Sequence, residues 1–248
     1  MRLKALIWDV DGTMVDNEEL HRAAFNQAFE DFGLGWCWGR AVYADLLRVT
    51  GGRERILHFM ERAACVPPNG PSPHALAAVL HVRKTVIYNR LLGGGAVALR
   101  PGVRRLLRQA RDRGVLLAIA TTTSRINVHT LLGKTLASEG IAWAAMTTGE
   151  DVARKKPAPE VYAVTLARLG LAPGQCLALE DSAHGVAAAC DAGIRTIAVV
   201  NGYTENQDMG RAFAAYSHFG EPDSPCAVRH GPAVASGCVD LDHLAAWL

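Results

Sequence analysis

The amino-acid sequence predicts an α/β fold in which a Rossmann-like parallel sheet carries an inserted, all-helical domain. Between residues 100 and 200, short apolar segments alternate with helical patterns, which is typical of βαβ units. Residues 17–92 show helical patterns without a strand signal, and they directly follow the first predicted strand. We therefore expect an α/β core built from residues 1–16 and 97–248, with a helical cap built from residues 17–96.

The composition is that of an ordinary soluble globular protein. Half of the 248 residues are hydrophobic and a fifth are charged. The formal net charge is only +2, and Lys and Arg are dispersed, so we expect no nucleic-acid partner. No segment has the roughly 20 apolar residues of a membrane helix or an N-terminal signal peptide. The six cysteines lack metal-ligand spacing and are expected to be reduced, so we predict a cytoplasmic protein. We also expect it to be a monomer without a membrane partner.

The elements follow one another along the chain. A strand at residues 3–8 opens the core, and Asn17 is a plausible N-cap for the first cap helix, which ends at Gly33. Further cap helices are expected at residues 40–48, 53–64 and 74–92, with a loop at 67–73. In the core we expect helices at residues 102–113, 125–138, 159–169 and 183–192, and strands at 115–120, 143–147, 176–179 and 195–200. Beyond Gly202 the pattern weakens, and we expect a long loop at 220–237 and a final helix at 241–248.

The most informative motif is Asp9-Val10-Asp11-Gly12-Thr13, at the carboxyl end of the first strand. Open α/β sheets build their sites at this edge, where a carboxylate can ligate a metal, act as a nucleophile, or do both. A calcium-binding EF-hand loop also begins D-x-D-G, but it requires a Glu at position twelve, where this chain has Leu20. The preceding strand also disfavours the EF-hand.

Three further polar segments end predicted core strands. The hydroxyls and N–H groups of residues 121–124 suit a phosphate oxygen, although a plain helix N-cap alone would explain them as well. Lys156 is held by the following Pro157 and can neutralise phosphate charge, whereas Lys155 fits a solvated surface lysine better. Glu180 and Asp181 can complete an oxygen shell for a metal, or form a helix-start charge pair.

Taken together and in this order, these motifs resemble those of the haloacid dehalogenase superfamily. The cap sequences resemble more narrowly the β-phosphoglucomutase-like branch, and within it the CbbY-type xylulose-1,5-bisphosphate phosphatases. That narrower resemblance rests on motifs spread over the cap and its return to the core: Glu18-Glu19-Leu20-His21, Trp36-Cys37-Trp38, Tyr43, residues 51–56, 81–84, 99–102 and 121–124.

The resemblance implies a Mg²⁺-dependent phosphatase that acts on a sugar phosphate through an aspartyl phosphate. Asp9 would be the nucleophile, and Asp11 would be the general acid and then the base. Thr121 and Lys156 would hold the transferring phosphoryl group. Mg²⁺ would be bound by Asp9, the backbone carbonyl of Asp11 and Asp181, with Glu180 as a possible supporting acid. The expected substrate is xylulose 1,5-bisphosphate, an inhibitor of Rubisco in the Calvin cycle, which would become xylulose 5-phosphate.

The cap is expected to select the substrate. Gly51 and Gly52 form a glycine-rich turn before a predicted helix, a place that binds anions, and Arg53 follows it. Arg55, His81 and Lys84 supply further cationic groups for a second phosphate, unless they are exposed residues of the cap helices. By the resemblance, the substrate-binding set also includes Glu18, Tyr43, Ser124 and Asn127.

Two other functions use the same residues. A β-phosphoglucomutase-type phosphomutase has the same nucleophile, acid and cap, although Thr13 is the residue usual in the phosphatases of the family. A broad sugar phosphatase needs no distal phosphate site. A non-enzymatic binding module would be expected to lack a catalytic group, and none is missing here.

Overall fold

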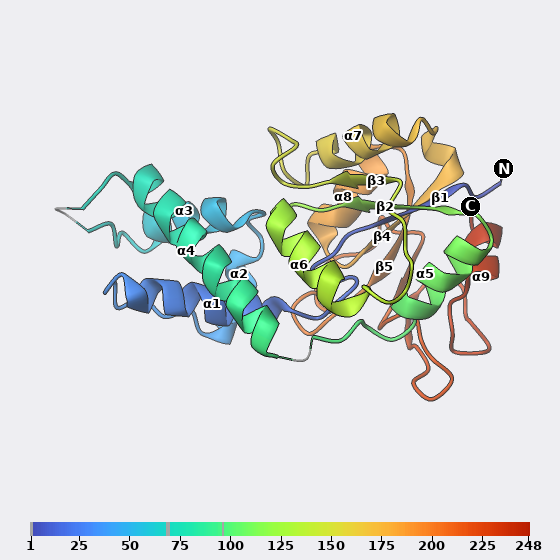
Figure 1. Ribbon diagram of the computed structural model, residues 1–248, viewed down its shortest axis with the longest axis horizontal. Helices are drawn as coiled ribbons and strands as arrows, with labels where there is room; N and C mark the ends of the chain where they lie inside the picture. Colours follow the sequence, from blue (N-terminus) through green and yellow to red (C-terminus); the bar gives the residue numbers. More distant parts are fainter. Residues whose placement is uncertain (1, 68–69, 96) are drawn as a thin grey trace.

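A computed structural model describes residues 2–67, 70–95 and 97–248 (Figure 1). The core is a seven-stranded sheet in the order β3-β2-β1-β4-β5-β6-β7, parallel except for β7. Its strands are β1 (Ala5–Trp8), β2 (Leu116–Ala120), β3 (Ala145–Thr147), β4 (Cys176–Glu180), β5 (Arg195–Val199), β6 (Ala214–Tyr216) and β7 (Val228–His230). The predicted α/β fold with a parallel sheet is confirmed.

Helices cover both faces of the sheet, so each central strand is buried on both sides. In β1, Ala5 and Ile7 face a cluster built with α7 and α8, while Leu6 and Trp8 face a cluster built with α5, α6 and α9. These helices are α5 (Val103–Asp112), α6 (Arg125–Thr135), α7 (Glu160–Leu169), α8 (Ala183–Asp191) and α9 (Leu241–Ala246). This double burial explains why the strands are almost wholly apolar in the sequence.

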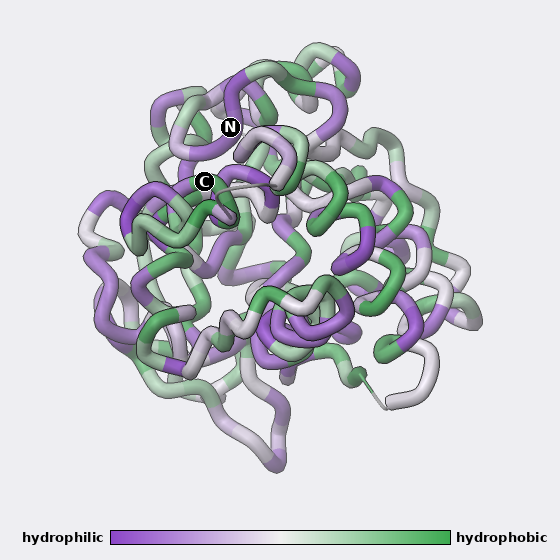
Figure 2. Tube along the Cα trace, turned by 90° about the vertical axis from the view of Figure 1, so that its left-hand side faces the viewer, coloured by the Kyte–Doolittle hydropathy of each residue, from purple (hydrophilic) through white to green (hydrophobic). Residues whose placement is uncertain are grey.

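Four helices form a separate layer at one end of the sheet (Figure 1). They are α1 (Glu18–Asp31), α2 (Arg40–Leu46), α3 (Gly52–Arg62) and α4 (Pro73–Gly94). An aromatic-rich core of their own, around Phe25, Phe29 and Trp38, holds them together. Figure 2 shows hydrophilic and hydrophobic residues alternating along the coiled segments, as expected for helices with one buried face. Parts of the predicted 67–73 loop and residue 96, the predicted end of the cap, lie outside the described residues.

The helical layer is inserted at a point where the chain leaves and rejoins the core side by side. Val15 forms an antiparallel bridge with Leu99, and the N–H of Arg100 donates to the carbonyl of Met14 at 2.8 Å. The Arg100 guanidinium then donates to four backbone carbonyls, those of Gly12, Val199, Val200 and Ser217. The loop after β1 is thereby tied to the end of β5.

The C-terminal residues extend the sheet, and here the sequence prediction was wrong in part. The segment expected as a loop at 220–237 contains β7, which pairs antiparallel with the unpredicted β6. Both strands have only three residues, too short to show a period of two. Arg105 of α5 fixes the segment by donating to the carbonyls of Phe219, Gly220 and Val239. Among the described helices, none has both the length and the apolar character that a membrane crossing requires.

We expect Gly102→Ala to destabilise the fold far more than Gly114→Ala. Both glycines have positive φ, +86° and +67°, at the two ends of α5. A Cβ at Gly102 would lie 2.5 Å from Cβ of Phe219, whereas a Cβ at Gly114 meets nothing within 4 Å. Urea unfolding should show a loss of about 1–2 kcal/mol for Gly114→Ala, from backbone strain alone. Gly102→Ala should lose about 1–3 kcal/mol more, from overpacking. Equal losses would contradict the steric argument.

Candidate active site

One pocket, between the carboxyl edge of the sheet and helices α1, α3 and α4, collects most of the predicted site residues. Those that line it are Asp9, Asp11, Glu18, Gly51, Gly52, Arg55, His81, Lys84, Thr121, Ser124, Asn127, Lys156 and Asp181. Tyr43, Arg53 and Glu180 were also predicted for the site and do not line it. The pocket therefore joins groups from both the sheet and the helical layer, as a site that closes over its ligand requires.

Lys156 lies at the floor of the pocket between two carboxylates. Its Nζ donates to Asp9 Oδ1 and to Glu180 Oε1, both at 2.6 Å, and to the carbonyl of Ala120 at 3.0 Å. Burial alone would lower the pKa of Lys156, but the charges of Asp9 and Glu180 outweigh it and raise the pKa. The ammonium group therefore stays protonated. Tyr162 completes the group, because its hydroxyl donates to Glu180.

Asp9, Glu180 and Asp181 form a cluster that suits a metal ion. One carboxylate oxygen from each lies within 4.8 Å of the others. Burial raises the pKa of Asp9 and of Asp181, and the neighbouring negative charges add to this effect. A cation at this point would offset the repulsion, and an all-oxygen donor set suits a hard divalent ion.

Close packing brings Asp181 against the loop that follows β1. A Cβ at Gly12, where φ is +84°, would lie 2.1 Å from Asp181 Oδ2. The same oxygen accepts a 2.7 Å hydrogen bond from Asn201 Nδ2. Thr13 Oγ1 lies 3.4 Å from an oxygen of Asp9 and from an oxygen of Asp181. Only glycine at position 12 lets the Asp9 loop approach this carboxylate.

Asp11 points towards the helical layer and is bound by its first helix. Its Oδ1 accepts a hydrogen bond from Asn17 Nδ2 at 2.5 Å and lies 3.2 Å from His21 Nε2. His21 Nδ1 is 2.6 Å from Lys84 Nζ, which links Asp11 to α4. Burial alone would raise the pKa of Asp11, but the neighbouring His21 ring and the hydrogen bonds from His21 and Asn17 lower it overall. Asp11 is therefore an ionised carboxylate in this structure.

The loop after β2 presents hydroxyl groups to the pocket. Thr121 is nearly buried, and its Oγ1 accepts a hydrogen bond from the N–H of Thr123 at 3.3 Å. Ser124 is the N-cap of α6 by position, yet its hydroxyl makes no capping bond. That hydroxyl is buried and has no hydrogen-bond partner among the described residues. It is therefore free to bind a ligand in the pocket.

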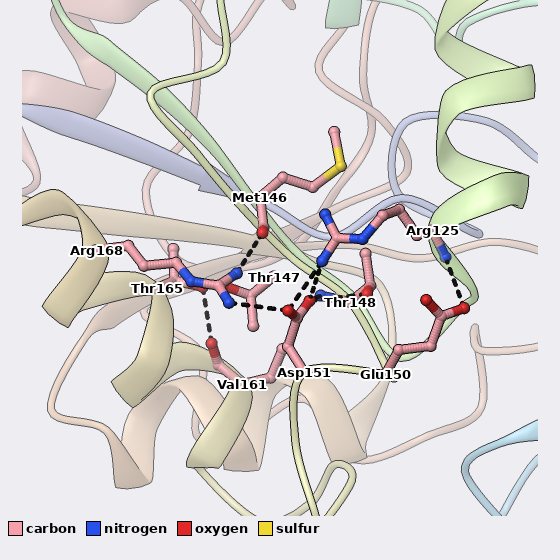
Figure 3. A network of polar contacts seen from close by, with 9 residues as sticks. All are labelled: Arg125, Met146, Thr147, Thr148, Glu150, Asp151, Val161, Thr165 and Arg168. Carbon is pink, nitrogen blue, oxygen red and sulfur yellow. Dashed lines mark hydrogen bonds and ion pairs between the residues drawn. The ribbon is translucent and has the colours of Figure 1, made fainter.

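A network around Asp151 fixes this loop against the one that follows β3 (Figure 3). The Asp151 carboxylate accepts hydrogen bonds from the Arg125 and Arg168 guanidinium groups at 2.7–2.9 Å. It also accepts bonds from the N–H and the hydroxyl of Thr148, both at 2.8 Å. Gly149 packs directly on the backbone of Thr122, where a Cβ would lie 2.3 Å from the carbonyl oxygen. The position of the hydroxyl-bearing loop is therefore fixed by α6 through Arg125, by α7 through Arg168, and by the segment after β3 through Gly149.

The helical layer supplies the cationic wall of the pocket. Burial lowers the pKa of Lys84 to about 8, so Lys84 is largely protonated at neutral pH. Burial also lowers the pKa of His81 to about 4, with Lys84 and Lys155 adding to the effect, so His81 is uncharged at neutral pH. Arg55 lines the pocket, and its Nη1 donates to the hydroxyl of Tyr43 at 3.2 Å. Lys84 and Arg55 are therefore the cationic groups that the helical layer contributes to the pocket lining.

The structure places several predicted residues differently from their expected roles. Tyr43 is buried behind the wall, where its hydroxyl donates to Glu18 at 2.8 Å. Arg53 is exposed and lies outside the pocket. Asn127 Oδ1 accepts a 2.8 Å hydrogen bond from Asn89 of α4, so this side chain also joins the cap to α6. Asn17 holds the N-cap position, but its side chain binds Asp11 instead of capping the helix.

Lys155 corrects an expectation taken from the sequence. Instead of a solvated surface position it has a half-buried one in the pocket wall, where it pairs with Glu54 of α3. The sequence analysis also missed Asn201 and Tyr162. Asn201 follows β5 directly, so the rule that polar residues at carboxyl ends of strands build sites would have found it. Tyr162 faces the site from inside α7, and nothing in the sequence pattern distinguishes it from a core residue.

Comparison with known proteins agrees with this geometry. The family model for haloacid dehalogenase-like hydrolases matches residues 3–193. The plasmid-encoded protein CbbY of Cupriavidus necator is 39% identical over 246 residues, covering 99% of this chain and 96% of its own. CbbY of Rhodobacter capsulatus is 45% identical over 213 residues, covering 86% of this chain and 92% of its own.

Solved structures give the same result. A mutant of CbbY from Rhodobacter sphaeroides, crystallised in complex with xylulose-(1,5)bisphosphate, aligns with a TM-score of 0.82 and 37% identity, covering 89% of this chain and 96% of its own. A β-phosphoglucomutase-like protein from Thermotoga maritima aligns with a TM-score of 0.62 and 27% identity, covering 86% of this chain and 94% of its own. With the family model spanning most of the chain and CbbY proteins alike along nearly its whole length, this chain belongs to the haloacid dehalogenase superfamily of hydrolases, as a CbbY-type member.

Proposed function

We propose that this protein is a Mg²⁺-dependent sugar-phosphate phosphatase that removes one phosphate from xylulose 1,5-bisphosphate and leaves xylulose 5-phosphate. The observation that carries the proposal is the position of Asp9, whose carboxylate binds Lys156 and belongs to the acidic cluster, with Asp11 two residues further along the same loop. Relatives named phosphatases and the bisphosphate complex of a CbbY relative support it.

Asp9 is the proposed nucleophile. One of its carboxylate oxygens attacks phosphorus, the bond from phosphorus to the sugar oxygen breaks, and an aspartyl phosphate forms. Water then attacks this phosphorus, the bond to Asp9 breaks, and inorganic phosphate leaves. Lys156 and Thr121, which line the pocket with Asp9, are the proposed partners of the phosphoryl oxygens, and the positive charge of Lys156 would reduce repulsion between phosphate and Asp9.

Asp11 is the proposed proton carrier. In the first step the sugar oxygen takes a proton from Asp11, and in the second step the Asp11 carboxylate takes a proton from the attacking water. The lowered pKa keeps Asp11 ionised in this structure, which is the form that the second step needs. The first step requires Asp11 to be protonated when the substrate is bound. Asn17 and His21 orient the carboxylate in both steps.

Asp9, Asp181 and the backbone carbonyl of Asp11 are the proposed ligands of Mg²⁺. Burial raises the pKa of Asp9 and of Asp181, and the neighbouring carboxylates raise both further, so a bound cation would favour the ionised form that a metal ligand needs. Bound Mg²⁺ would supply positive charge against the phosphate and the carboxylates. Glu180 is the least suited of the three acidic residues to be a direct ligand, because its Oε1 already binds Lys156 and Tyr162.

The cap residues are proposed to bind the second phosphate. Gly51 and Gly52 begin α3, whose N-terminus favours an anion, and Arg55 and Lys84 lie in the same wall. A distal phosphate bound there would draw the cap and the core together around the scissile phosphate. Part of the binding energy would then orient the reacting groups, so truncated substrates should lose kcat as well as affinity.

We expect Asp9→Asn to abolish turnover while the protein stays folded. The amide of the substituted side chain is not a nucleophile that can form an acyl phosphate. Phosphate release measured with Mg²⁺ present should therefore fall to background. Activity of the unchanged protein should also vanish with EDTA and return with added Mg²⁺. Asp112→Asn, an exposed position, is the control and should keep full activity. Substantial turnover by Asp9→Asn would overturn the covalent mechanism.

We expect Asp11→Asn to slow sugar-phosphate hydrolysis by about 10²–10⁴-fold, the usual contribution of general acid–base catalysis. The backbone carbonyl is kept, so Mg²⁺ affinity measured by calorimetry should change little. Formation of the aspartyl phosphate from p-nitrophenyl phosphate should suffer less, because p-nitrophenolate leaves without a proton; a rapid burst of p-nitrophenol would report it. A near-normal kcat for the sugar substrate would mean that another residue is the acid.

We expect the preference for the bisphosphate over xylulose 1-phosphate to fall as the pH rises through about 8. Lys84, whose pKa is lowered to about 8, loses its charge in that range and with it the attraction for a distal phosphate. Lys84→Met should therefore show a weak preference at every pH, measured as the ratio of kcat/KM values. Lys134→Met, on the exposed face of α6, is the matched control.

Two experimental outcomes would contradict the proposed substrate or the proposed reaction. Equal efficiency toward the bisphosphate and its monophosphates would indicate a broad sugar phosphatase. Conversion of one sugar phosphate into an isomer, without release of inorganic phosphate, would indicate the phosphomutase that shares Asp9, Asp11 and the cap.

A further inference from the structure

Glu54 and Lys155 form an ion pair that joins the cap to the core at the mouth of the pocket. Lys155 Nζ lies 2.9 Å from both carboxylate oxygens of Glu54. Glu54 belongs to the first turn of α3, and Lys155 belongs to the loop between β3 and α7. Both side chains are half-buried. The pair thus connects two segments that lie a hundred residues apart in the chain.

The glycine turn of the cap is packed against this pair. At Gly51, where φ is +97°, a Cβ would lie 2.2 Å from Glu54 Oε2 and 2.7 Å from Lys155 Nζ. At Gly52 a Cβ would lie 2.6 Å from Cδ2 of His81. The turn therefore lies in contact with the ion pair on one side and with His81 on the other. Its position depends on both neighbours.

The core side of the pair is itself fixed. The N–H groups of Ala153 and Arg154 donate to the Glu160 carboxylate at 2.8 and 3.1 Å. The next residue in the chain, Lys156, binds Asp9 at 2.6 Å. The glycine turn is therefore connected to Asp9 step by step. It packs against the Glu54–Lys155 pair, Lys155 is followed in the chain by Lys156, and Lys156 binds Asp9.

We propose that Glu54 and Lys155 are positioning residues that set the spacing between the glycine turn and Asp9, and so select substrates by the separation of their two phosphates. This inference rests on the proposed function, because it names the residues by which the proposed bisphosphate site would distinguish substrates of different length. Glu54 also neutralises Lys155, so the pair positions the turn without offering an unmatched cation to other anions. A substrate that is bound only at Asp9 does not use the spacing and should be nearly indifferent to it.

The test compares Glu54→Gln, Lys155→Gln and the double variant with xylulose 1,5-bisphosphate and with p-nitrophenyl phosphate. Each single variant should lower kcat/KM for the bisphosphate by about 5-fold, the upper end for a partly exposed ion pair. The double variant should be no worse than the singles, because the two residues act as one unit. For p-nitrophenyl phosphate the losses should be markedly smaller. Glu61→Gln, the same substitution at an exposed position of α3, should change neither substrate.

A second readout follows the turn directly. Hydrogen exchange at the amides of residues 50–55, measured without substrate, should be faster in both single variants than in Glu61→Gln. Unfolding midpoints should be measured alongside, so that a general loss of stability is recognised. Faster exchange at the turn with an unchanged midpoint is the signature of a positioning role.

Several results would overturn the inference. Improved bisphosphate turnover in Glu54→Gln together with reduced turnover in Lys155→Gln would show that Lys155 binds the substrate and that Glu54 competes with it. Additive losses, or equal losses on both substrates, would show that the pair does not set a spacing. If the unchanged enzyme itself shows no preference for the bisphosphate, the proposed substrate class fails together with this inference. A clear preference that the variants keep would remove only the inference.

Discussion

The ammonium group of Lys156 is the interaction on which the rest of the site depends, because it holds two carboxylates together in a nearly buried place. Asp9 comes from β1 and Glu180 from the end of β4, and both bind the same Nζ. Removing one partner of such a group leaves a buried charge without compensation, at a cost of about 3–5 kcal/mol. The charge that aligns the proposed nucleophile therefore also joins neighbouring strands of the sheet, and the site cannot relax independently of the core.

Around this centre, the two parts of the molecule divide the work. The sheet and its loops supply the carboxylates, the hydroxyls and Lys156. The helical layer supplies Lys84, Arg55 and the glycine turn, and it reaches Asp11 through His21. Asp11 is thus one of the points where the two parts meet. A ligand that draws the helical layer inwards would also adjust the environment of the proposed proton carrier.

Much of this arrangement could be predicted from the sequence, because its signals are local. Asp9, Thr121 and Asp181 each follow an apolar run, Lys156 lies in the loop after a weaker one, and parallel strands bring their carboxyl ends to one edge. Contacts between distant segments could not be predicted in this way. The partner of Lys155 is Glu54, and nothing near Lys155 in the sequence indicates it. The three-residue strands β6 and β7 were missed for another reason. They are too short to show an alternating hydrophobic pattern, and they form by adding to the edge of the sheet, beside a segment that Arg105 holds in place.

The bridge between Val15 and Leu99 has a consequence for how this architecture can vary. The chain leaves the core and returns to it at two residues that lie side by side, next to the hydrogen bond from Arg100 to Met14. The segment inserted between them is a loop whose two ends are held together, so the entropic cost of closing that loop rises only slowly with its length. Helices could be lengthened, lost or exchanged beyond this junction while the sheet keeps its register. The same core could therefore be fitted with lids of different size, and a transplanted lid would need to preserve little more than the pairing at its two ends.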